Sequence, residues 1–500
     1  MTEESLSLLD TTIRDVHTRM KAGELSCTQL VQGYLDRICR YDRQGPALHA
    51  IVNVNPQALE CARELDRHLA CTGVLKGPLH GVPVLVKDQA ETSFVPTTFG
   101  NRAYVDYQPA TDAFIICKLI EAGAVILAKT SMCDFAAGWF SFSSVTERTR
   151  NPYAPERDAG GSSAGTGAGL AANFGLVGVG EDTGGSIRIP ASFNNLFGLR
   201  VTTGLISRTG FAPLLHFQDT PGPMARSVRD LAKLLDVLVG YDAADPYTGA
   251  VSLAADAGHY EALLDGARID GVRIGVLQEG FGGDDPSSPE VNSVVHRLLE
   301  RLREAGAQTV DVRIPSLEDW LLRTSLYTLQ SKADLNRFMA GCAAAPRRTF
   351  DQIYANGWFH PLNDLFHALA AGPAEPDLAA YYSQRLAQVE FQRLLLNVYA
   401  AHGLDVLMYP DVQVLPPTYR ELESNKWTCL TFPTNTVIAS QSHLPALSMP
   451  AGFSGGRVPV GVEVVGKPYA EAALLRFAHA CEQLICPRLP PALEGMAVPA

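Results

Sequence analysis

The most informative segment of the chain reads Asp158-Ala-Gly-Gly-Ser162-Ser163-Ala-Gly165, and after an apolar run it continues as Gly180-Glu-Asp-Thr183-Gly184-Gly185-Ser186-Ile-Arg188. Two serines, Ser162 and Ser186, therefore follow glycine pairs within one short segment. Glycines let the backbone turn sharply and bring its N–H groups close to a bound carbonyl oxygen. A serine placed after such a turn can act as a nucleophile if a neighbouring group accepts its proton.

A lysine is the candidate base. The apolar strand Gly81-Val-Pro-Val-Leu-Val-Lys87 ends in it, and no histidine lies near either serine in the sequence. Lysine accepts a proton only when it is neutral, and its reference pKa of about 10.4 means that burial must favour the neutral form. The apolar run before Lys87 indicates such burial. Ordinary interpretations remain open for single residues: a surface lysine at a strand end, and serines that cap helices.

Short apolar segments alternate with longer amphipathic ones along most of the chain. The expected strands are 82–86, 125–128, 176–179, 272–277, 406–409, 446–449 and 460–465, and the expected helices include 112–122, 227–239, 289–305, 378–400 and 470–484. This alternation predicts an α/β protein with a large mixed, mostly parallel central β-sheet covered by helices on both faces.

The chain contains no evident linker, so we expect a single domain over 1–500. Residues 1–70 are predicted to form an N-terminal helical segment, in which Ser26-Cys-Thr-Gln29 fits a capping box. Residues 310–430 are predicted to form a helical insertion that lines the substrate pocket, because aromatic side chains such as Trp320, Trp358 and Trp427 are frequent there. Such a lining favours an apolar or aryl-containing substrate.

Composition narrows the class of partner. The chain has 500 residues and a formal net charge of -12, which disfavours general binding to nucleic acid or to an anionic membrane. Its ten cysteines show no metal-type spacing, and no apolar run is long enough to cross a membrane. Residues 1–10 do not read as a secretory signal peptide, because they lack a basic region followed by an apolar core. We therefore predict a cytoplasmic protein with a small-molecule amide substrate, no nucleic acid, no membrane, no metal and no cofactor, and leave a homodimer open.

Two motif matches in the glycine-rich stretch are incidental. Gly161-Ser-Ser163-Ala-Gly165 fits the nucleophile elbow of α/β-hydrolases, but that elbow follows a strand, whereas residues 151–158 read as a loop. Gly165-Thr-Gly167-Ala-Gly169 lacks the spacing of a dinucleotide loop and falls in an expected helix.

Lys87, Ser162 and Ser186, taken with their surroundings, closely resemble the amidase signature family. The matching segments are Gly77 to Asp88, Ala128-Lys-Thr-Ser-Met, Gly160-Gly-Ser162-Ser163, Asp182-Thr-Gly-Gly-Ser186-Ile-Arg188, Gly222-Pro-Met-Ala-Arg226-Ser, Leu444 to Gly452 and Pro459 to Gly466. The resemblance extends over about residues 5 to 485, and its segments are specific in this order and spacing.

The resemblance implies a Ser–Ser–Lys triad. Ser186 is then the nucleophile, Lys87 the base, and Ser162, which follows a cis peptide bond in the family, the relay between them. The resemblance also assigns the oxyanion hole to backbone N–H groups of Thr183, Gly184, Gly185 and Ser186. It places Ala136 and Trp139 near the acyl pocket. Asp182 and Arg188 are expected to pair and hold the nucleophile loop.

Four positions depart from the pattern that the resemblance implies. Ser131 replaces an asparagine, Cys133 stands where an acidic residue is frequent, Thr166 replaces a serine or glycine, and Glu181 replaces a small hydroxyl residue. None of the four is expected to touch the triad, so we expect them to affect the substrate and not the mechanism.

The resemblance implies an amidase that hydrolyses a non-peptide carboxylic amide, apolar or aryl-containing, to an acid plus ammonia or an amine through a serine acyl-enzyme. Other functions remain open. One alternative is the A subunit of a glutamine-dependent tRNA amidotransferase, and another is a hydrolase of carbamates or urea derivatives. A non-catalytic binding protein is disfavoured because all three triad residues are present.

Overall fold

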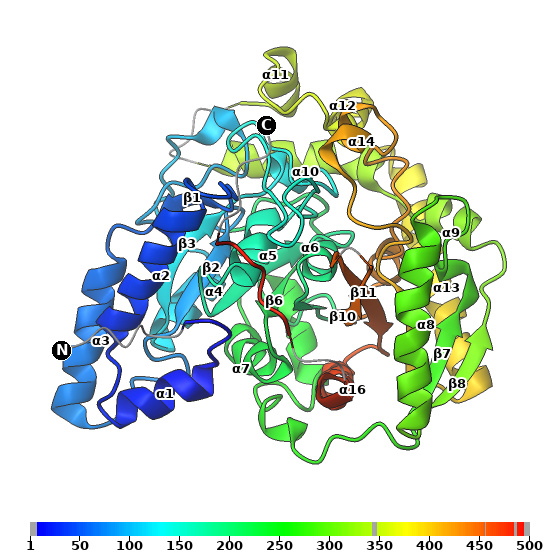
Figure 1. Ribbon diagram of the computed structural model, residues 1–500. Helices are drawn as coiled ribbons and strands as arrows, with labels where there is room; N and C mark the ends of the chain where they lie inside the picture. The colour runs from blue at the N-terminus through cyan, green and yellow to red at the C-terminus, as the bar shows by residue number, and fades with distance from the viewer. Residues whose placement is uncertain (1–7, 343–347, 456, 485–487, 495–500) are drawn as a thin grey trace.

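The computed structural model describes residues 8–342, 348–455, 457–484 and 488–494, and its centre is one 11-stranded sheet (Figure 1). The strands are β1 (Ile51–Val54), β2 (Pro83–Lys87), β3 (Val125–Thr130), β4 (Val177–Asp182), β5 (Phe197–Arg200), β6 (Thr220–Ala225), β7 (Arg273–Leu277), β8 (Gln308–Val312), β9 (Val406–Pro410), β10 (Ala446–Phe453) and β11 (Pro459–Val465).

The sheet is mixed, in the order β1-β3-β2-β4-β6-β5-β10-β11-β9-β7-β8. Parallel pairing joins β3, β2 and β4 on one side and β8, β7 and β9 on the other. Antiparallel ladders make every link between these two blocks and also attach β1 at the edge. The predicted large mixed sheet is confirmed, but its parallel share is smaller than expected, because β5, β6, β10 and β11 fold back on one another in the middle.

Helices flank this sheet. They are α1 (Ile13–Lys21), α2 (Cys27–Tyr41), α3 (Ala58–Thr72), α4 (Phe114–Glu121), α5 (Ala164–Ala171), α6 (Arg188–Phe193), α7 (Val228–Leu238), α8 (Ser288–Glu304), α9 (Leu317–Arg323), α10 (Tyr327–Gly341), α11 (Phe350–Ala355), α12 (Asp364–Ala371), α13 (Leu378–His402), α14 (Tyr419–Glu423), α15 (Val437–Gln441) and α16 (Glu471–Leu484).

Burial shows that both faces of the central strands are covered. Every residue of β2, β4, β6 and β11 is buried, although successive side chains of a strand point to opposite faces. Helices α5 and α6 contact each other and pack on the middle strands, while α4, α7, α16 and α8 form a second chain of contacting helices. The prediction of helices on both faces is confirmed.

The central strand β6 was not expected from the sequence. It reads Thr-Pro-Gly-Pro-Met-Ala, and proline cannot donate to a strand ladder. Its partner β5 pairs with Met224 and Ala225, so Pro221 and Pro223 are paired with β4 and not with β5. The nitrogen atoms of the two prolines can therefore point away from the ladder between β4 and β6, so that no hydrogen bond of that ladder is lost. This explains why prolines are tolerated in this strand.

The N-terminal segment predicted over 1–70 is helical in α1, α2 and α3, but it also supplies the edge strand β1. Its first seven residues lie outside the described part of the chain. The predicted capping box at Ser26 is present, because the Ser26 side chain accepts from the N–H of Gln29 and the Gln29 side chain accepts in return.

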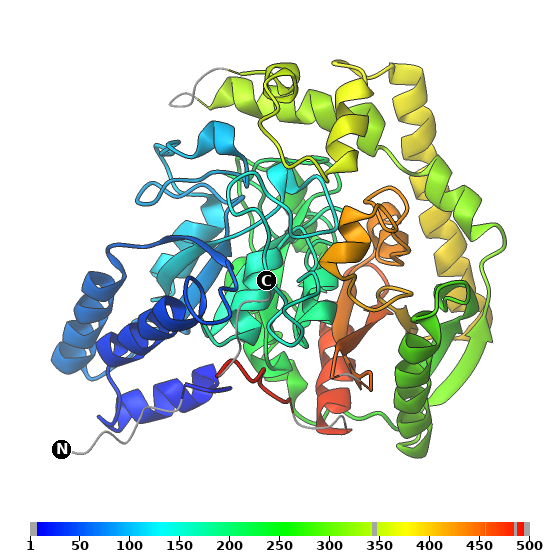
Figure 2. The same ribbon diagram turned by 45° about the horizontal axis from the view of Figure 1, so that its top comes forward.

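The segment predicted as a helical insertion, 310–430, contains α9 to α14, but it also supplies the end of β8 and the whole of β9 to the central sheet, and residues 343–347 within it are not described. Figure 2 shows α10 to α13 as a layer along the top of the molecule. Buried aromatic side chains of α10 to α12 share a hydrophobic cluster with loops that follow β3, including Phe135, Trp139 and Phe142, whereas Phe391 and Tyr399 of α13 belong to another cluster. This cluster is separate from the main core of the sheet. The division into a single domain with this insertion stays a prediction.

Across the described ranges, no helix is long and apolar enough to cross a membrane.

Candidate active site

Lys87 is the last residue of β2, between β3 and β4. Its side chain is fully buried. The ordinary interpretation as a surface lysine is therefore wrong. The strand before it is buried throughout, as the apolar run indicated, so the sheet delivers the Lys87 amine to the interior of the protein.

Ser162 lies in the turn before α5. Its Oγ is 2.8 Å from Lys87 Nζ, which donates to it. The Gly161–Ser162 peptide bond is cis, as the resemblance implies. Gly161 is required here because a Cβ at this position would collide with the carbonyl oxygen of Phe140. The structure thus brings two predicted triad members, 75 positions apart in the sequence, into direct contact.

Ser186 lies between β4 and α6 and is also fully buried. Its carbonyl oxygen accepts from the N–H of Ser163 at 3.1 Å, which ties the nucleophile loop to the residue next to the proposed relay. Its Oγ makes no hydrogen bond in the structure. Buried hydroxyl groups are normally hydrogen-bonded, so an unpartnered one in such a loop is a candidate reactive group.

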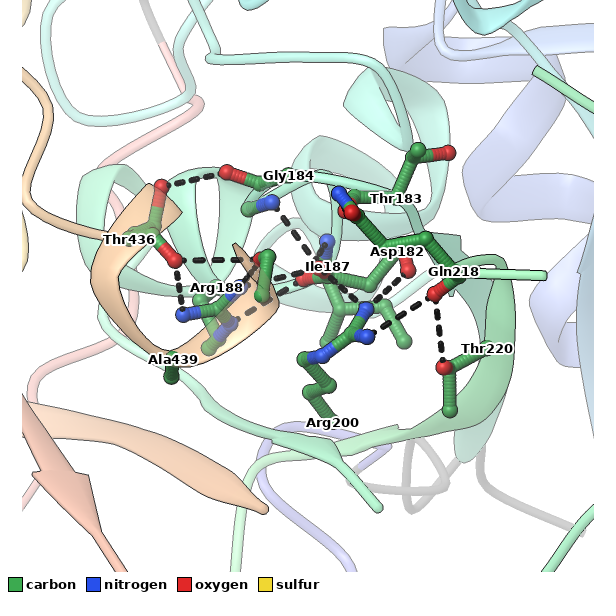
Figure 3. Close-up of polar contacts among 12 residues, drawn as sticks. Asp182, Thr183, Gly184, Ile187, Arg188, Arg200, Gln218, Thr220, Thr436 and Ala439 are labelled. Carbon is green, nitrogen blue, oxygen red and sulfur yellow. Dashed lines mark hydrogen bonds and ion pairs between the residues drawn. The ribbon is translucent and has the colours of Figure 1, made fainter. Parts of the chain in front are cut away.

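A buried ion-pair network fixes the loop that carries Ser186 (Figure 3). The Asp182 carboxylate accepts from the N–H groups of Gly185 and Ile187 at 2.8 and 3.0 Å. It also pairs with Arg188 at 2.9 Å and Arg200 at 3.2 Å. The structure contains the predicted Asp182–Arg188 pair, and Arg200 is a further partner that was not anticipated.

The charges in this network compensate one another. Burial acts against the charged form of Asp182, but Arg188 and Arg200 outweigh it and hold the pKa of this carboxyl below its usual range. On its other side Arg188 pairs with Glu463 at 2.7 Å. Burial raises the pKa of Glu463 to about 7, although the nearby Arg188 opposes the shift. The network is thus a fixed scaffold, because each arginine is held by more than one acceptor.

The predicted oxyanion donors lie together on this loop, but they are not equally free. The N–H of Gly185 donates to Asp182, while the carbonyl oxygen of Gly184 accepts from Thr436 and that of Thr183 accepts from Gln218. These carbonyl contacts orient the intervening peptide units (Figure 3). The N–H groups of Thr183, Gly184 and Ser186 remain the better candidates for stabilising an oxyanion.

Trp139 lies against the nucleophile loop. A Cβ on Gly184 would collide with the Trp139 ring and with the Tyr327 hydroxyl. The two rings meet edge to face, with centroids 5.8 Å apart. The Trp139 indole N–H donates to the carbonyl oxygen of Cys429 at 2.7 Å, which fixes its orientation. Ala136 is buried in the same aromatic cluster as Trp139, and its place beside an acyl pocket stays a prediction.

Glu181 was expected not to touch the triad, and this expectation is wrong. Its Oε2 lies 3.2 Å from Lys87 Nζ, and its backbone carbonyl oxygen accepts from the same nitrogen at 3.0 Å. The Glu181 side chain is 1% exposed. Residue spacing could not reveal this contact, because it depends on the pairing of β2 with β4. The one available signal was the presence of a carboxylate where the resemblance implies a small hydroxyl residue.

Comparison with known proteins finds relatives that are similar to this chain over nearly its whole length. The family model described as Amidase matches residues 29–475. The A subunit of glutamyl-tRNA(Gln) amidotransferase from Heliobacterium modesticaldum is 32% identical over 496 residues, which cover 96% of this chain and 97% of that protein.

Two solved structures are also similar. The native peptide amidase of Stenotrophomonas maltophilia superposes with a TM-score of 0.85 at 34% identity, covering 98% of this chain and 99% of that one. The A subunit of glutamyl-tRNA(Gln) amidotransferase from Thermotoga maritima superposes with a TM-score of 0.73 at 26% identity, covering 96% of each chain.

These relatives correct the predicted partners. The expectation of a small-molecule substrate alone, without nucleic acid, is wrong, because similar proteins along nearly the full length are named as parts of an amidotransferase for glutamyl-tRNA(Gln). The acidic net charge misled here, since it describes the average surface of one chain. One member of a complex can work on RNA without binding it through a basic surface of its own.

The motifs around Lys87, Ser162 and Ser186 indicate the same family as three comparisons do: the family model, the full-length relatives and the superposed structures. The chain therefore belongs to the amidase signature family and is an amide-hydrolysing enzyme.

Proposed function

We propose that Ser186 attacks the amide carbonyl, with Ser162 and Lys87 as its proton relay. The observation that carries this proposal is the buried contact of 2.8 Å between Lys87 Nζ and Ser162 Oγ, beside a loop in which the Oγ of Ser186 has no hydrogen-bond partner. The site lies in the protein interior, where oriented N–H groups stabilise a developing oxyanion more strongly than in water.

Each bond that forms or breaks in this mechanism is accompanied by a proton transfer. As Ser186 Oγ bonds to the carbonyl carbon, its proton passes to Ser162, and the Ser162 proton passes to a neutral Lys87. When the C–N bond breaks, Lys87 returns a proton through Ser162 to the leaving nitrogen, which departs as ammonia or an amine. Water then attacks the acyl-enzyme by the same route and releases the carboxylic acid.

For the substrate, glutamine hydrolysed within a tRNA amidotransferase complex is the first candidate. The full-length similarity to the A subunit of the glutamyl-tRNA(Gln) enzyme supports it. In this role the enzyme releases ammonia from the glutamine side chain for a partner that carries the tRNA-bound acceptor.

A bulkier amide is the second candidate, and the aromatic surroundings of the nucleophile loop favour it. Trp139 and Tyr327 both lie against Gly184, within the cluster that joins α10 to α12 with the loops after β3. The TM-score is also higher for the peptide amidase than for the Thermotoga amidotransferase chain. We therefore widen the predicted class from non-peptide amides to amides that include those of peptides. Carbamates and urea derivatives remain a further alternative, and the cytoplasmic location stays a prediction.

The test is release of ammonia or amine from glutamine, aliphatic amides, benzamides, anilides, peptide amides and carbamates, with Ser186→Ala as the control. Ser186→Ala should abolish turnover, by about 10⁴-fold or more, because the nucleophile of a triad acts as a unit with its base. The change removes one buried oxygen, so the melting temperature should change little.

This set of amide substrates distinguishes glutamine from bulkier amides as the substrate of the enzyme. Turnover of glutamine alone, increased by copurifying chains, would support the amidotransferase role, whereas turnover of aryl or peptide amides without partners would support the second candidate. Full activity of Ser186→Ala on any amide would refute the proposed mechanism.

A further inference from the structure

The Lys87 amine has a buried counter-ion. Glu181 Oε2 lies 3.2 Å from Lys87 Nζ, on the neighbouring strand β4, and both side chains are almost completely excluded from solvent. Lys87 Nζ therefore has three acceptors: Ser162 Oγ, the Glu181 carbonyl oxygen and the Glu181 carboxylate. Three acceptors match the three N–H bonds of an ammonium group, whereas a neutral amine donates only two.

A second carboxyl group lies behind Glu181. Thr183 Oγ1 is 3.2 Å from Glu181 Oε1 and 2.6 Å from Asp219 Oδ1. A hydroxyl has one hydrogen, so Thr183 can donate to only one of these carboxyls at a time, and its shorter contact is the one to Asp219. Burial, and next the charge of Glu181, raise the pKa of Asp219 well above its usual value. Asp219 also accepts from the N–H groups of Leu214 and Leu215 at 2.9 and 3.1 Å, so it has donors of its own, and Glu181 is the carboxylate that faces Lys87.

The other ionisable groups near the pair do not replace this charge. Burial raises the pKa of the Cys133 thiol, against the opposing effect of Lys87, so Cys133 stays a neutral thiol. Asp182, the next residue along β4, is charged, but Arg188 and Arg200 already neutralise it. Among the described groups that face Lys87, Glu181 is therefore its counter-ion.

We propose that Glu181 is a positioning residue that holds the ammonium charge of Lys87 in the resting site, so that the lysine–carboxylate pair sets the pH above which the enzyme is active. This inference rests on the proposed function, in which only neutral Lys87 can accept the proton from Ser162. An opposite charge within about 4–6 Å favours the charged form of a group by about one to three pH units. The small hydroxyl residue that the family resemblance implies at this position would supply no such charge.

The consequence is a shift in the acidic limb of the pH–rate profile. Without the carboxylate, a buried ammonium is no longer stabilised, and Lys87 becomes neutral at lower pH. Glu181→Gln should therefore move the acidic limb downward by about one to three pH units. The Glu181 backbone carbonyl position still accepts from Lys87 Nζ in this variant, so the lysine should keep its place.

The experiment measures the pH dependence of covalent labelling of Ser186 by a fluorophosphonate probe, followed by intact mass. In this reaction Ser186 Oγ bonds to phosphorus, fluoride leaves, and the proton passes through Ser162 to Lys87, so the rate reports the base without a known substrate. Wild type, Glu181→Gln and Glu181→Ser are compared. Glu181→Ser is the second variant, in case the glutamine variant does not fold.

The matched control is Glu471→Gln. Glu471 is a fully buried carboxyl group on α16, where it accepts from the N–H of Thr202 at 2.6 Å; among the described residues its side chain has no hydrogen bond to Lys87, Ser162 or Ser186. The inference is supported if the acidic limb of the pH–rate profile moves to lower pH in both Glu181 variants and stays at the wild-type pH in Glu471→Gln.

An unmoved limb, or one that moves to higher pH, would overturn the inference and leave the proposed function intact. Equal labelling of wild type and Ser186→Ala would instead show that the proposed function itself is wrong. The two failures are therefore distinguishable.

Discussion

Glu181 and Asp182 are adjacent carboxylates at the end of β4, yet they belong to different electrostatic environments. Successive side chains of a strand point to opposite faces, so Glu181 meets Lys87 while Asp182 meets Arg188 and Arg200. Asp182 also accepts from two backbone N–H groups, and its network continues to Glu463. Glu181 instead pairs with one lysine, which in the proposed mechanism accepts a proton.

One strand end can therefore both hold a loop in place and contribute to a site where a proton moves. Guanidinium groups stay protonated in proteins and bind carboxylates in fixed geometry, so the Asp182 side is suited to hold a loop. A lysine changes protonation when it is buried, so the Glu181 side is suited to a site where a proton moves. Substitutions on each side test whether the two environments differ in this way.

The largest effect is expected from Lys87→Met, which removes the amine and keeps a chain of similar length. Turnover should fall by about 10⁴-fold or more, because the relay loses its base. The melting temperature should fall as well, since Glu181 is left as a buried charge without a partner. Amide hydrolysis and calorimetry measure the two effects.

The double variant Lys87→Met with Glu181→Gln is the control for that stability loss. It should recover much of the melting temperature but none of the turnover, and a double-mutant cycle gives the coupling between the two residues. A single Lys87→Met variant as stable as wild type would mean that the pair carries little charge in the folded protein.

The next effect is expected from Asp182→Asn, which breaks the scaffold side. Removing one partner of a buried ion pair destabilises a protein by about 3–5 kcal/mol, so the free energy of unfolding should drop and turnover should be lost with the loop geometry. The pKa of Asp182 lies below its usual range, so its contribution is complete at neutral pH and disappears as the pH falls through the folded-state value.

The gap in stability between wild type and Asp182→Asn should therefore narrow in acid, as denaturant unfolding at neutral and at low pH can show. If instead Glu181→Gln proves as destabilising as Asp182→Asn, the contrast between a scaffold side and a titrating side does not hold.

The smallest effect is expected from Ser163→Ala. The Ser163 hydroxyl makes only long contacts of 3.3 Å with the backbone of Glu181, while the bond to Ser186 uses the Ser163 N–H, which alanine keeps. Turnover should fall less than about tenfold, compared with a loss of several orders of magnitude for Ser162→Ala. The reverse order in a kinetic comparison would mean that Ser163, and not Ser162, is the relay.

Much of the fold follows from local patterns. The strands predicted at 82–86, 406–409 and 460–465 and the helices at 227–239 and 289–305 correspond to β2, β9, β11, α7 and α8 with small shifts at the ends. The three strands are largely apolar runs, and the two helices show apolar residues at helical spacing. The strands β1, β5, β6 and β8 were missed because they are short, polar or interrupted by proline and glycine, so only pairing with neighbouring strands makes them strands.

The residue types of the site could be predicted from local patterns, because the glycine turns before Ser162 and Ser186 and the apolar strand before Lys87 are visible along the chain. Only the tertiary structure decided which charges meet. Strand register places Glu181 against Lys87, and the return of β5 brings Arg200 to Asp182. The physical reason is that electrostatic interaction depends on distance and burial in the folded chain, and neither can be read from the spacing of residues along it.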